Sequence, residues 1–299
     1  MNANDLITAI INADPLDIGA ALRAIHIFEE EALDKFINLQ YTEGSPGRIE
    51  VNVSDEMQNR LFERTQSQWA KVGASEPYAS VLSNEKFSMK NIAENLIEFR
   101  QSGISGIDQL ISLAKKNDVS INFNRCFELG CGVGRMTSYF ADHFLEVVAA
   151  DISPGNISVC QEYFKEIGKL NVDLKLLTKL MDLEQIGYFD AFLSFIAIQH
   201  NSPPIQRYIL EKTLSKLNYG GVFLFQTIVH HPTYSYTAKS NFNYPSNQDF
   251  EMHVLPMREV LHVISRCGLT LLDVIKDRQG GYGIDSNSFF GINLKKTCV

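Results

Sequence analysis

Hydrophobic positions in the C-terminal part of the chain alternate between short apolar runs and stretches with helical spacing. Residues 189–196 are nearly all apolar, as in a central parallel strand that is buried on both faces. Similar runs predict further strands at 146–151, 173–180, 222–228, 269–275 and 288–294, besides one that ends before residue 130. Helical spacing separates several of them, and the glycine-rich residues 279–283 predict a turn between the last two. We therefore predict an α/β domain over residues 120–299, with a mostly parallel sheet of seven strands and an antiparallel last strand.

The first 119 residues have a different pattern, in which helical pieces predominate. Apolar residues at helical spacing predict helices at 18–39, 54–72, 88–102 and 107–115, the second of them capped by Ser54. The sequence also predicts a turn at 43–47 and an extended stretch at 76–82, which interrupt the series. We expect a helical N-terminal cap over residues 1–119, which either covers the substrate or mediates formation of a homodimer.

Composition limits the possible partners. The chain has 299 residues, of which 45% are hydrophobic, and a formal net charge of −8. No cluster of basic residues is present of the kind that nucleic-acid binding requires, so a small molecule is the expected partner. The N-terminal segment lacks a basic signal region and its apolar stretches are interrupted by acidic residues, so we expect no membrane span and a cytoplasmic location. We also expect no metal site, because the five cysteines have no CxxC spacing and residues 230–255 carry carboxylates only at Asp249 and Glu251.

A glycine-rich loop after the first predicted strand carries the strongest chemical signal. Gly130, Gly132 and Gly134 alternate with other residues, and Glu128 precedes them. Small residues let the chain turn sharply and bring its backbone against a ligand. A dinucleotide fingerprint needs glycine at its first, third and sixth positions, but the sixth residue counted from Gly130 is Arg135. The spacing therefore excludes that fingerprint and leaves the pattern Glu-x-Gly-x-Gly-x-Gly.

This pattern, together with the signals that follow it, resembles the motifs of the class I S-adenosylmethionine (SAM) dependent methyltransferases. The resemblance covers residues 120–299 and implies a Rossmann-like fold, SAM as the cofactor and S-adenosylhomocysteine (SAH) as the product. Asp151 ends the second strand about 20 residues beyond the loop, where an acid binds ribose hydroxyls. By the resemblance, residues after the second, third and fourth strands also contact the cofactor. The expected cofactor-binding residues are Glu128, Gly130, Gly132, Gly134, Asp151, Ile152, Asp182, Leu183 and Gln199.

With such a cofactor, the protein must position the acceptor more than it must activate the methyl group. A sulfonium methyl group is already electrophilic, so the protein must mainly align the acceptor for in-line displacement and exclude water. For an alcohol acceptor, a general base adds about 10²–10⁴-fold, and histidine suits that role. His200 ends the fourth strand at the edge where open α/β sheets bind ligands, so it is the first candidate for the catalytic base. The alternative is a loop histidine bonded to the backbone. Trp69 and Tyr78 are candidates to close over the cofactor, although a core position is favoured for Trp69.

The acceptor is expected to lie near residues 230–255, a loop of about 25 residues that is longer than usual β-to-α connections. Its side chains suit a polyhydroxylated ligand, although a polar surface loop anchored by its aromatics is the alternative. The expected substrate-binding residues are His230, His231, Tyr234, Tyr236 and His253. Residues 76–82 are also similar to a stretch in methyltransferases of bacterial sugar and surface-glycan pathways. We therefore expect a sugar or glycan hydroxyl as the acceptor, with an N- or C-methyltransferase of a metabolite, or a catalytically inactive SAM- or SAH-binding regulatory subunit, as alternatives.

Overall fold

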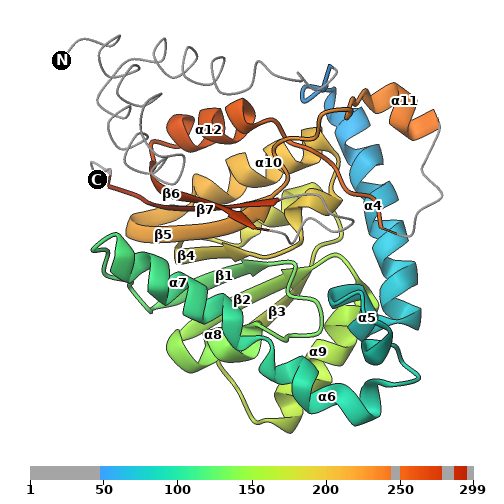
Figure 1. Ribbon diagram of the computed structural model, residues 1–299, viewed down its shortest axis with the longest axis vertical. Helices are drawn as coiled ribbons and strands as arrows, with labels where there is room; N and C mark the ends of the chain where they lie inside the picture. Colours follow the sequence, from blue (N-terminus) through green and yellow to red (C-terminus); the bar gives the residue numbers. More distant parts are fainter. Residues whose placement is uncertain (1–47, 244–249, 278–285, 295–299) are drawn as a thin grey trace.

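The computed structural model describes residues 48–243, 250–277 and 286–294. Within them, seven strands form one sheet in the order β3-β2-β1-β4-β5-β7-β6 (Figure 1). The strands are β1 (Arg125–Leu129), β2 (Glu146–Asp151), β3 (Val172–Leu176), β4 (Phe189–Ser194), β5 (Leu217–Thr227), β6 (Thr270–Asp277) and β7 (Ser286–Ile292). β7 is antiparallel to β5 and β6, whereas the other neighbouring pairs are parallel. The predicted Rossmann-like sheet with an antiparallel last strand is confirmed.

Helices cover both faces of this sheet (Figure 1). One face carries α7 (Ile104–Lys116), α8 (Thr137–His143) and α9 (Pro154–Glu166), and the other carries α10 (Pro203–Leu214) and α12 (Met257–Arg266). Because side chains alternate along a strand, β1 contributes to two cores. Phe127 and Leu129 belong to the core under α10 and α12, whereas Cys126 belongs to the core under α7 and α8. The result is a three-layer arrangement whose strand ends are free to form a site.

A long helix of the N-terminal region, α4 (Asp55–Ser75), lies beside the strand ends (Figure 1). It begins after Ser54, whose side-chain oxygen accepts a hydrogen bond from the Met57 N–H as predicted. Two glycines allow its C-terminal end to pack closely on α9, since a Cβ on Gly155 would lie 2.5 Å from the carbonyl oxygen of Gly73. The remaining elements of this region and of residues 230–255 are α5 (Pro77–Val81), η2 (Glu85–Phe87), α6 (Ile92–Gln101) and α11 (Ala238–Asn243). The predicted boundary between residues 119 and 120 stays a prediction.

Some predicted elements differ from the observed ones. Residues 76–82 were expected to be extended but contain helix α5, because Pro77 at its first position is compatible with helical φ. The third strand ends at Leu176, four residues earlier than expected. Asp182 accepts hydrogen bonds from the backbone N–H groups of Thr178 and Lys179, which favours a turn into η3 (Leu180–Gln185). The predicted elements at 18–39, 43–47 and 279–283 lie outside the described residues.

Candidate active site

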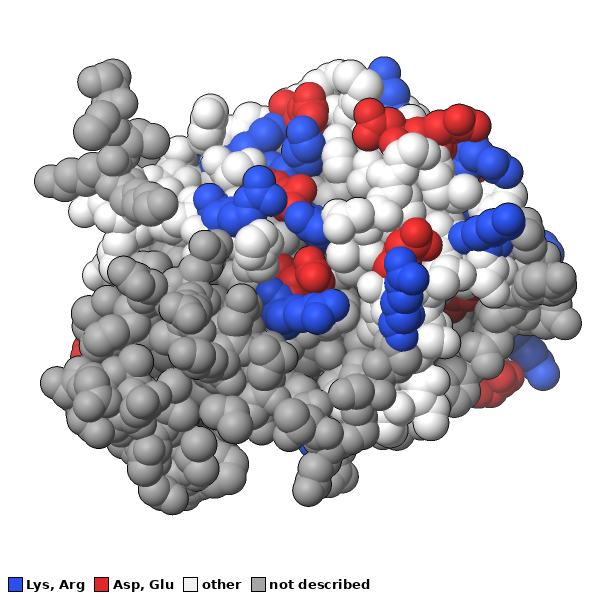
Figure 2. Space-filling view, turned by 90° about the horizontal axis from the view of Figure 1, so that it is seen from above, with Lys and Arg blue, Asp and Glu red and all other residues white. Residues whose placement is uncertain are grey.

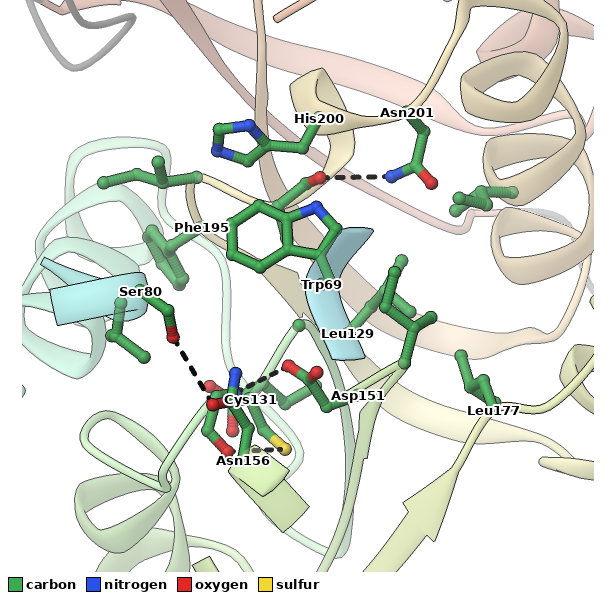
Figure 3. A pocket seen from close by; sticks show the side chains of 18 of the residues that line it. Trp69, Ser80, Leu129, Cys131, Asp151, Asn156, Leu177, Phe195, His200 and Asn201 are labelled. Atoms are coloured by element: carbon green, nitrogen blue, oxygen red, sulfur yellow. Dashed lines mark hydrogen bonds between the residues drawn. The ribbon is translucent and has the colours of Figure 1, made fainter. Parts of the chain in front are cut away.

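A cavity of about 500 Å³ lies at the carboxyl ends of β1, β2 and β4 (Figure 3). This is the edge at which open α/β sheets bind ligands, and the volume is that of a small-molecule site. The glycine loop and Asp151 form one part of its wall, while Trp69 of α4 and Ser80 of α5 come from the N-terminal region. The sheet domain and the N-terminal helices therefore build the cavity together.

The glycine loop is shaped by positive backbone angles. Gly130, Gly132 and Gly134 have φ values of 79°, 55° and 81°, which favour glycine over other residues. Protein packing also requires the first two, because a Cβ would lie 2.3 Å from Ala197 Cβ at Gly130 and 2.5 Å from Val81 Cγ2 at Gly132. Helix α5 thus packs directly against the loop.

Two carboxylates stand beside this loop. Asp151 accepts hydrogen bonds from the N–H of Gly132 at 2.9 Å and from the N–H of Ser153 at 2.8 Å. Burial raises the pKa of Asp151, and these N–H groups oppose the rise. Burial also raises the pKa of Glu128 to about 7, although Thr137 and Arg135 lower it. Glu128 is 4% exposed and its Oε2 has no hydrogen-bond partner among the described residues, so this oxygen can accept a hydrogen bond from a ligand.

The predicted cofactor-binding residues divide into two groups. Glu128, Gly130, Gly132, Asp151, Ile152 and Leu183 line the cavity. Three others lie outside its wall. A Cβ on Gly134 would meet Cys160 and Phe164, so this glycine serves packing against α9. Asp182 holds the turn into η3, and Gln199 is fully buried. Direct contact of these three with a cofactor stays a prediction.

The end of β4 brings a strained backbone and a histidine to the cavity. Ile196 has a φ of 51°, which is rare for a β-branched residue, and its N–H donates to Gln226 Oε1 at 3.1 Å. His200, in η4 (Ile198–His200), follows and lines the cavity. Its Nδ1 lies 2.9 Å from the main-chain oxygen of Glu251. Burial lowers the pKa of His200 to about 4; the Glu251 carbonyl opposes this and His253 adds to it, so the ring is neutral near pH 7.

Aromatic side chains surround His200. The ring of Trp69 lies 5.0 Å from the imidazole in an edge arrangement, and Phe250 lies 5.3 Å from Trp69. Phe195 and Met252 also line this part of the cavity. Trp69 thus lines the cavity rather than a closed core, while Tyr78 packs edge-on against Phe99, and closure of either residue over a cofactor stays a prediction. Phe250 and Met252 were missed, because no local pattern marks them.

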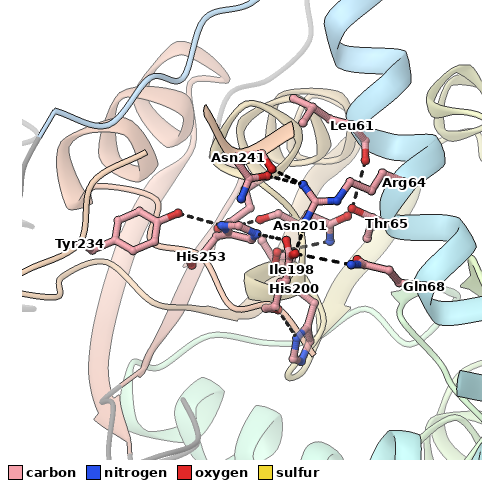
Figure 4. Close-up of polar contacts among 12 residues, drawn as sticks. Leu61, Arg64, Thr65, Gln68, Ile198, His200, Asn201, Tyr234, Asn241 and His253 are labelled. Carbon is pink, nitrogen blue, oxygen red and sulfur yellow. Dashed lines mark hydrogen bonds and ion pairs between the residues drawn. The ribbon is translucent and has the colours of Figure 1, made fainter. Parts of the chain in front are cut away.

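The residues expected to bind the acceptor do not line the cavity. Tyr234 and His253 contact each other, with 2.8 Å between the hydroxyl and Nδ1 (Figure 4). Tyr236 packs its ring edge-on against His253. Burial raises the pKa of Tyr236 to about 12. His231 Nδ1 lies 3.3 Å from Thr233 Oγ1. His230 is the preceding residue, three positions after the end of β5. Their contact with a substrate stays a prediction.

Comparison with known proteins identifies the central part of the chain. A family model described as a methyltransferase domain matches residues 127–221, which run from β1 into β5. This part of the chain is therefore similar to a methyltransferase domain. Two curated relatives, both named ubiquinone biosynthesis O-methyltransferase, come from a Ruegeria species and from Ruegeria pomeroyi. The first is 29% identical over 117 residues, which are 39% of this chain and 46% of the relative. The second is 30% identical over 108 residues, 36% of this chain and 42% of the relative, so the match spans less than half the length of either.

Solved structures of methyltransferases share the fold. Magnesium protoporphyrin IX methyltransferase from Synechocystis, with bound SAH, has a TM-score of 0.51 at 13% identity, covering 77% of this chain and 99% of that one. A putative sarcosine dimethylglycine methyltransferase from Galdieria sulphuraria has a TM-score of 0.50 at 14% identity, covering 66% of this chain and 89% of that one. These likenesses confirm the Rossmann-like fold that the sequence predicts, and SAM is the cofactor predicted for it.

The residues of the methyltransferase domain fit this cofactor. SAM carries positive charge, and the carboxylates of Glu128 and Asp151 both face the cavity. The unpartnered Oε2 of Glu128 supplies an acceptor where a cationic donor would be favourable. Arg135 also lines the wall, and burial lowers the pKa of its guanidinium while Glu128 opposes that change.

Other properties of the described residues concern partners. No described helix has the length and apolar character to cross a membrane. Groups of three or more His, Cys, Asp or Glu side chains suited to a metal ion are likewise not found in the described part of the chain. On the face seen in Figure 2, the described basic side chains are interspersed with acidic ones rather than gathered into a basic stripe. The predictions about metal, nucleic acid and location stay predictions.

Proposed function

We propose that this protein transfers a methyl group from SAM to a hydroxyl of a small-molecule acceptor, with His200 as the general base. The observation that carries the proposal is the state of the imidazole. A main-chain carbonyl only accepts hydrogen bonds, so Nδ1, 2.9 Å from the Glu251 oxygen, carries the proton of the neutral ring. Nε2 then has a free lone pair, on a residue that shares a cavity with the cofactor loop.

The cofactor-side residues bind and orient. When bound, SAM supplies an electrophilic methyl carbon on a sulfonium. The Asp151 carboxylate, already fixed by backbone N–H groups, is placed to accept from hydroxyl donors of the ribose. Glu128 offers its buried Oε2 to a cationic group, and the backbone of Gly130 and Gly132 forms the adjacent wall.

The acceptor-side residues exclude water and receive a proton. Trp69, Phe195 and Phe250 give this part of the cavity a flat, apolar lining. His200 Nε2 would take the proton of the acceptor hydroxyl as the C–O bond forms and the bond from the methyl carbon to sulfur breaks, so that the products are a neutral ether and SAH. Because burial keeps His200 neutral, the base is in its active form throughout the neutral pH range.

This lining favours a planar, largely apolar acceptor, such as a phenol or catechol, over the sugar expected from the sequence. Tyr234, Tyr236 and His253, which were assigned to a sugar, contact one another instead. The names of the Ruegeria relatives add support, since they denote O-methyltransferases of ubiquinone biosynthesis. A sugar or glycan hydroxyl is the second candidate, because Asn201 and Ser80 also line the cavity and offer polar groups.

The test is methyl transfer from labelled SAM by the purified full chain into two matched panels. One panel holds phenols and catechols, and the other holds nucleotide sugars and glycan fragments. Labelled product from the first panel, lost in His200→Ala while SAH affinity measured by calorimetry is retained, is the expected result. Product from the second panel alone would reassign the acceptor. Methylation of nitrogen or carbon would contradict O-methylation, and SAH binding without any product would favour a regulatory subunit. An unchanged rate in His200→Ala would remove His200 as the base.

A further inference from the structure

A buried polar network lies next to the cavity and joins α4 to residues 251–253 (Figure 4). Its centre is the Glu251 carboxylate, whose side chain is 8% exposed. Arg64 of α4 forms an ion pair with Oε1, and His253 Nε2 lies 3.2 Å from Oε2. Gln68, one turn further along α4, has its Nε2 3.5 Å from Oε1. Neither Glu251 nor Arg64 lines the cavity, so the network lies behind its wall.

Several elements hold this network in place. Arg64 also donates to the main-chain oxygen of Asn241 at 3.0 Å and to its side-chain oxygen at 2.6 Å. The main-chain N–H of His253 donates to the Gln199 carbonyl at 2.8 Å, and the main-chain carbonyl of His253 accepts from Gln206 Nε2 at 3.1 Å. The backbone around Glu251 is therefore fixed from α4 on one side and from η4 and α10 on the other.

The main chain of Glu251 carries the connection to the cavity. Its carbonyl oxygen accepts the hydrogen bond from His200 Nδ1, and this bond selects the tautomer with the lone pair on Nε2. We infer that Glu251, held by Arg64 and His253, is a positioning residue that fixes the tautomer and orientation of His200. The inference rests on the proposed function, in which Nε2 is the base.

A purely structural role is a poor explanation for these side chains. Taking a carboxylate and a guanidinium out of water is costly unless they are paired, and apolar side chains of similar size would fill the space as well. The ion pair instead ties the N-terminal helix to the one peptide group that orients the base. The orientation of His200 thereby depends on α4 being in place.

Histidine ¹⁵N NMR of the protein with bound SAH tests the inference without any acceptor. The His200 signals are those missing from the His200→Ala spectrum. We expect wild-type His200 to be neutral with hydrogen on Nδ1, and Glu251→Gln or Arg64→Met to give a mixture with hydrogen on Nε2. Arg60→Met is the matched control, because Arg60 lies one turn earlier on α4 and stacks on Phe242 outside the network. A wild-type ring with hydrogen on Nε2, or an unchanged tautomer in both variants, would overturn the inference.

Kinetics with the acceptor found by the panels give an independent test. Glu251→Gln should lower kcat about 10-fold, since a misplaced base loses part of its contribution, while SAH affinity stays within about 2-fold. In the His200→Ala background the same change should lower kcat less than about 2-fold, because the group through which it acts is gone. Equal factors in both backgrounds would refute a role through His200. If Glu251→Gln fails to fold, the paired variant Arg64→Met with Glu251→Gln replaces it in both experiments. A fully active His200→Ala protein would instead refute the proposed base.

Discussion

Glu128→Gln is expected to stabilise the protein without cofactor at alkaline pH and to weaken its binding of SAM. The wild-type carboxyl is buried, and its pKa is raised from an ordinary value of 4.5 to about 7. Above pH 7 the folded protein must therefore hold a charge that the unfolded chain holds more easily. Glutamine has the same shape and never ionises, so it removes this cost while losing the negative charge that faces the cavity.

The size of the effect follows from the two pKa values. Between pH 4.5 and 7 the unfolded chain releases the proton while the folded protein keeps it, so the free energy of unfolding falls as pH rises through this range. At about 1.4 kcal/mol per pKa unit, the raised pKa of Glu128 lowers the free energy of unfolding by about 3 kcal/mol at pH 8 and by about 1 kcal/mol at pH 5. Glu128→Gln should then raise the free energy of unfolding by about 2 kcal/mol more at pH 8 than at pH 5.

Urea unfolding of both proteins at the two pH values, without cofactor, measures this difference. Glu63→Gln is the control, since Glu63 is an exposed residue of α4. Calorimetry with SAM should show wild-type affinity rising between pH 6 and pH 8 as Glu128 ionises, with a smaller rise in the variant. An equal gain in stability at both pH values, or a loss at pH 8, would refute the reasoning.

Three further predictions concern the walls of the cavity and the base. Gly132→Ala should lower the free energy of unfolding by about 1–2 kcal/mol because φ is 55°, and by a further amount because the new Cβ would clash with Val81. Adding Val81→Ala should recover only the part due to the clash, and urea unfolding measures both effects. Trp69→Ala should raise KM for a planar acceptor more than Trp69→Phe does, with SAH affinity nearly unchanged; equal KM values would argue against an acceptor surface there. Protonation of His200 should lower kcat only near pH 4, so kcat should not fall from this cause between pH 8 and pH 6. A fall in kcat centred near pH 6.5 would show that the imidazole is not buried.

The sheet and the cofactor loop could be predicted because each is written in a local pattern. Continuous apolar runs marked the strands, and alternating glycines marked the loop near Glu128 and Asp151. Both signals depend only on residues that are close together in the sequence. The order of the strands then follows from the predicted fold class. The exact ends were less predictable, since the end of β3 depends on the side chain of Asp182, which favours a turn.

The acceptor side could not be predicted in the same way, because it is assembled from distant segments. Trp69 and Phe250 are separated by most of the sheet domain in sequence, yet their rings lie 5.3 Å apart. The tyrosine-rich loop was expected to face the acceptor, but Tyr234 and His253 satisfy each other instead. Composition indicated a binding surface there, whereas the side chains that reach the cavity come from several elements that pack together only in the folded chain.

The shared construction of the cavity has a consequence for how this scaffold can be redesigned. The glycine loop, Asp151 and His200 all lie within the matched residues 127–221, whereas Trp69 and Phe250 come from outside them. Under the proposed function, two aromatic side chains of the acceptor wall can therefore be varied without changing any of the matched residues, although Phe195 of the same wall lies among them. A library randomised at Trp69 and Phe250 would search for new acceptors while every clone keeps the glycine loop, Asp151 and His200.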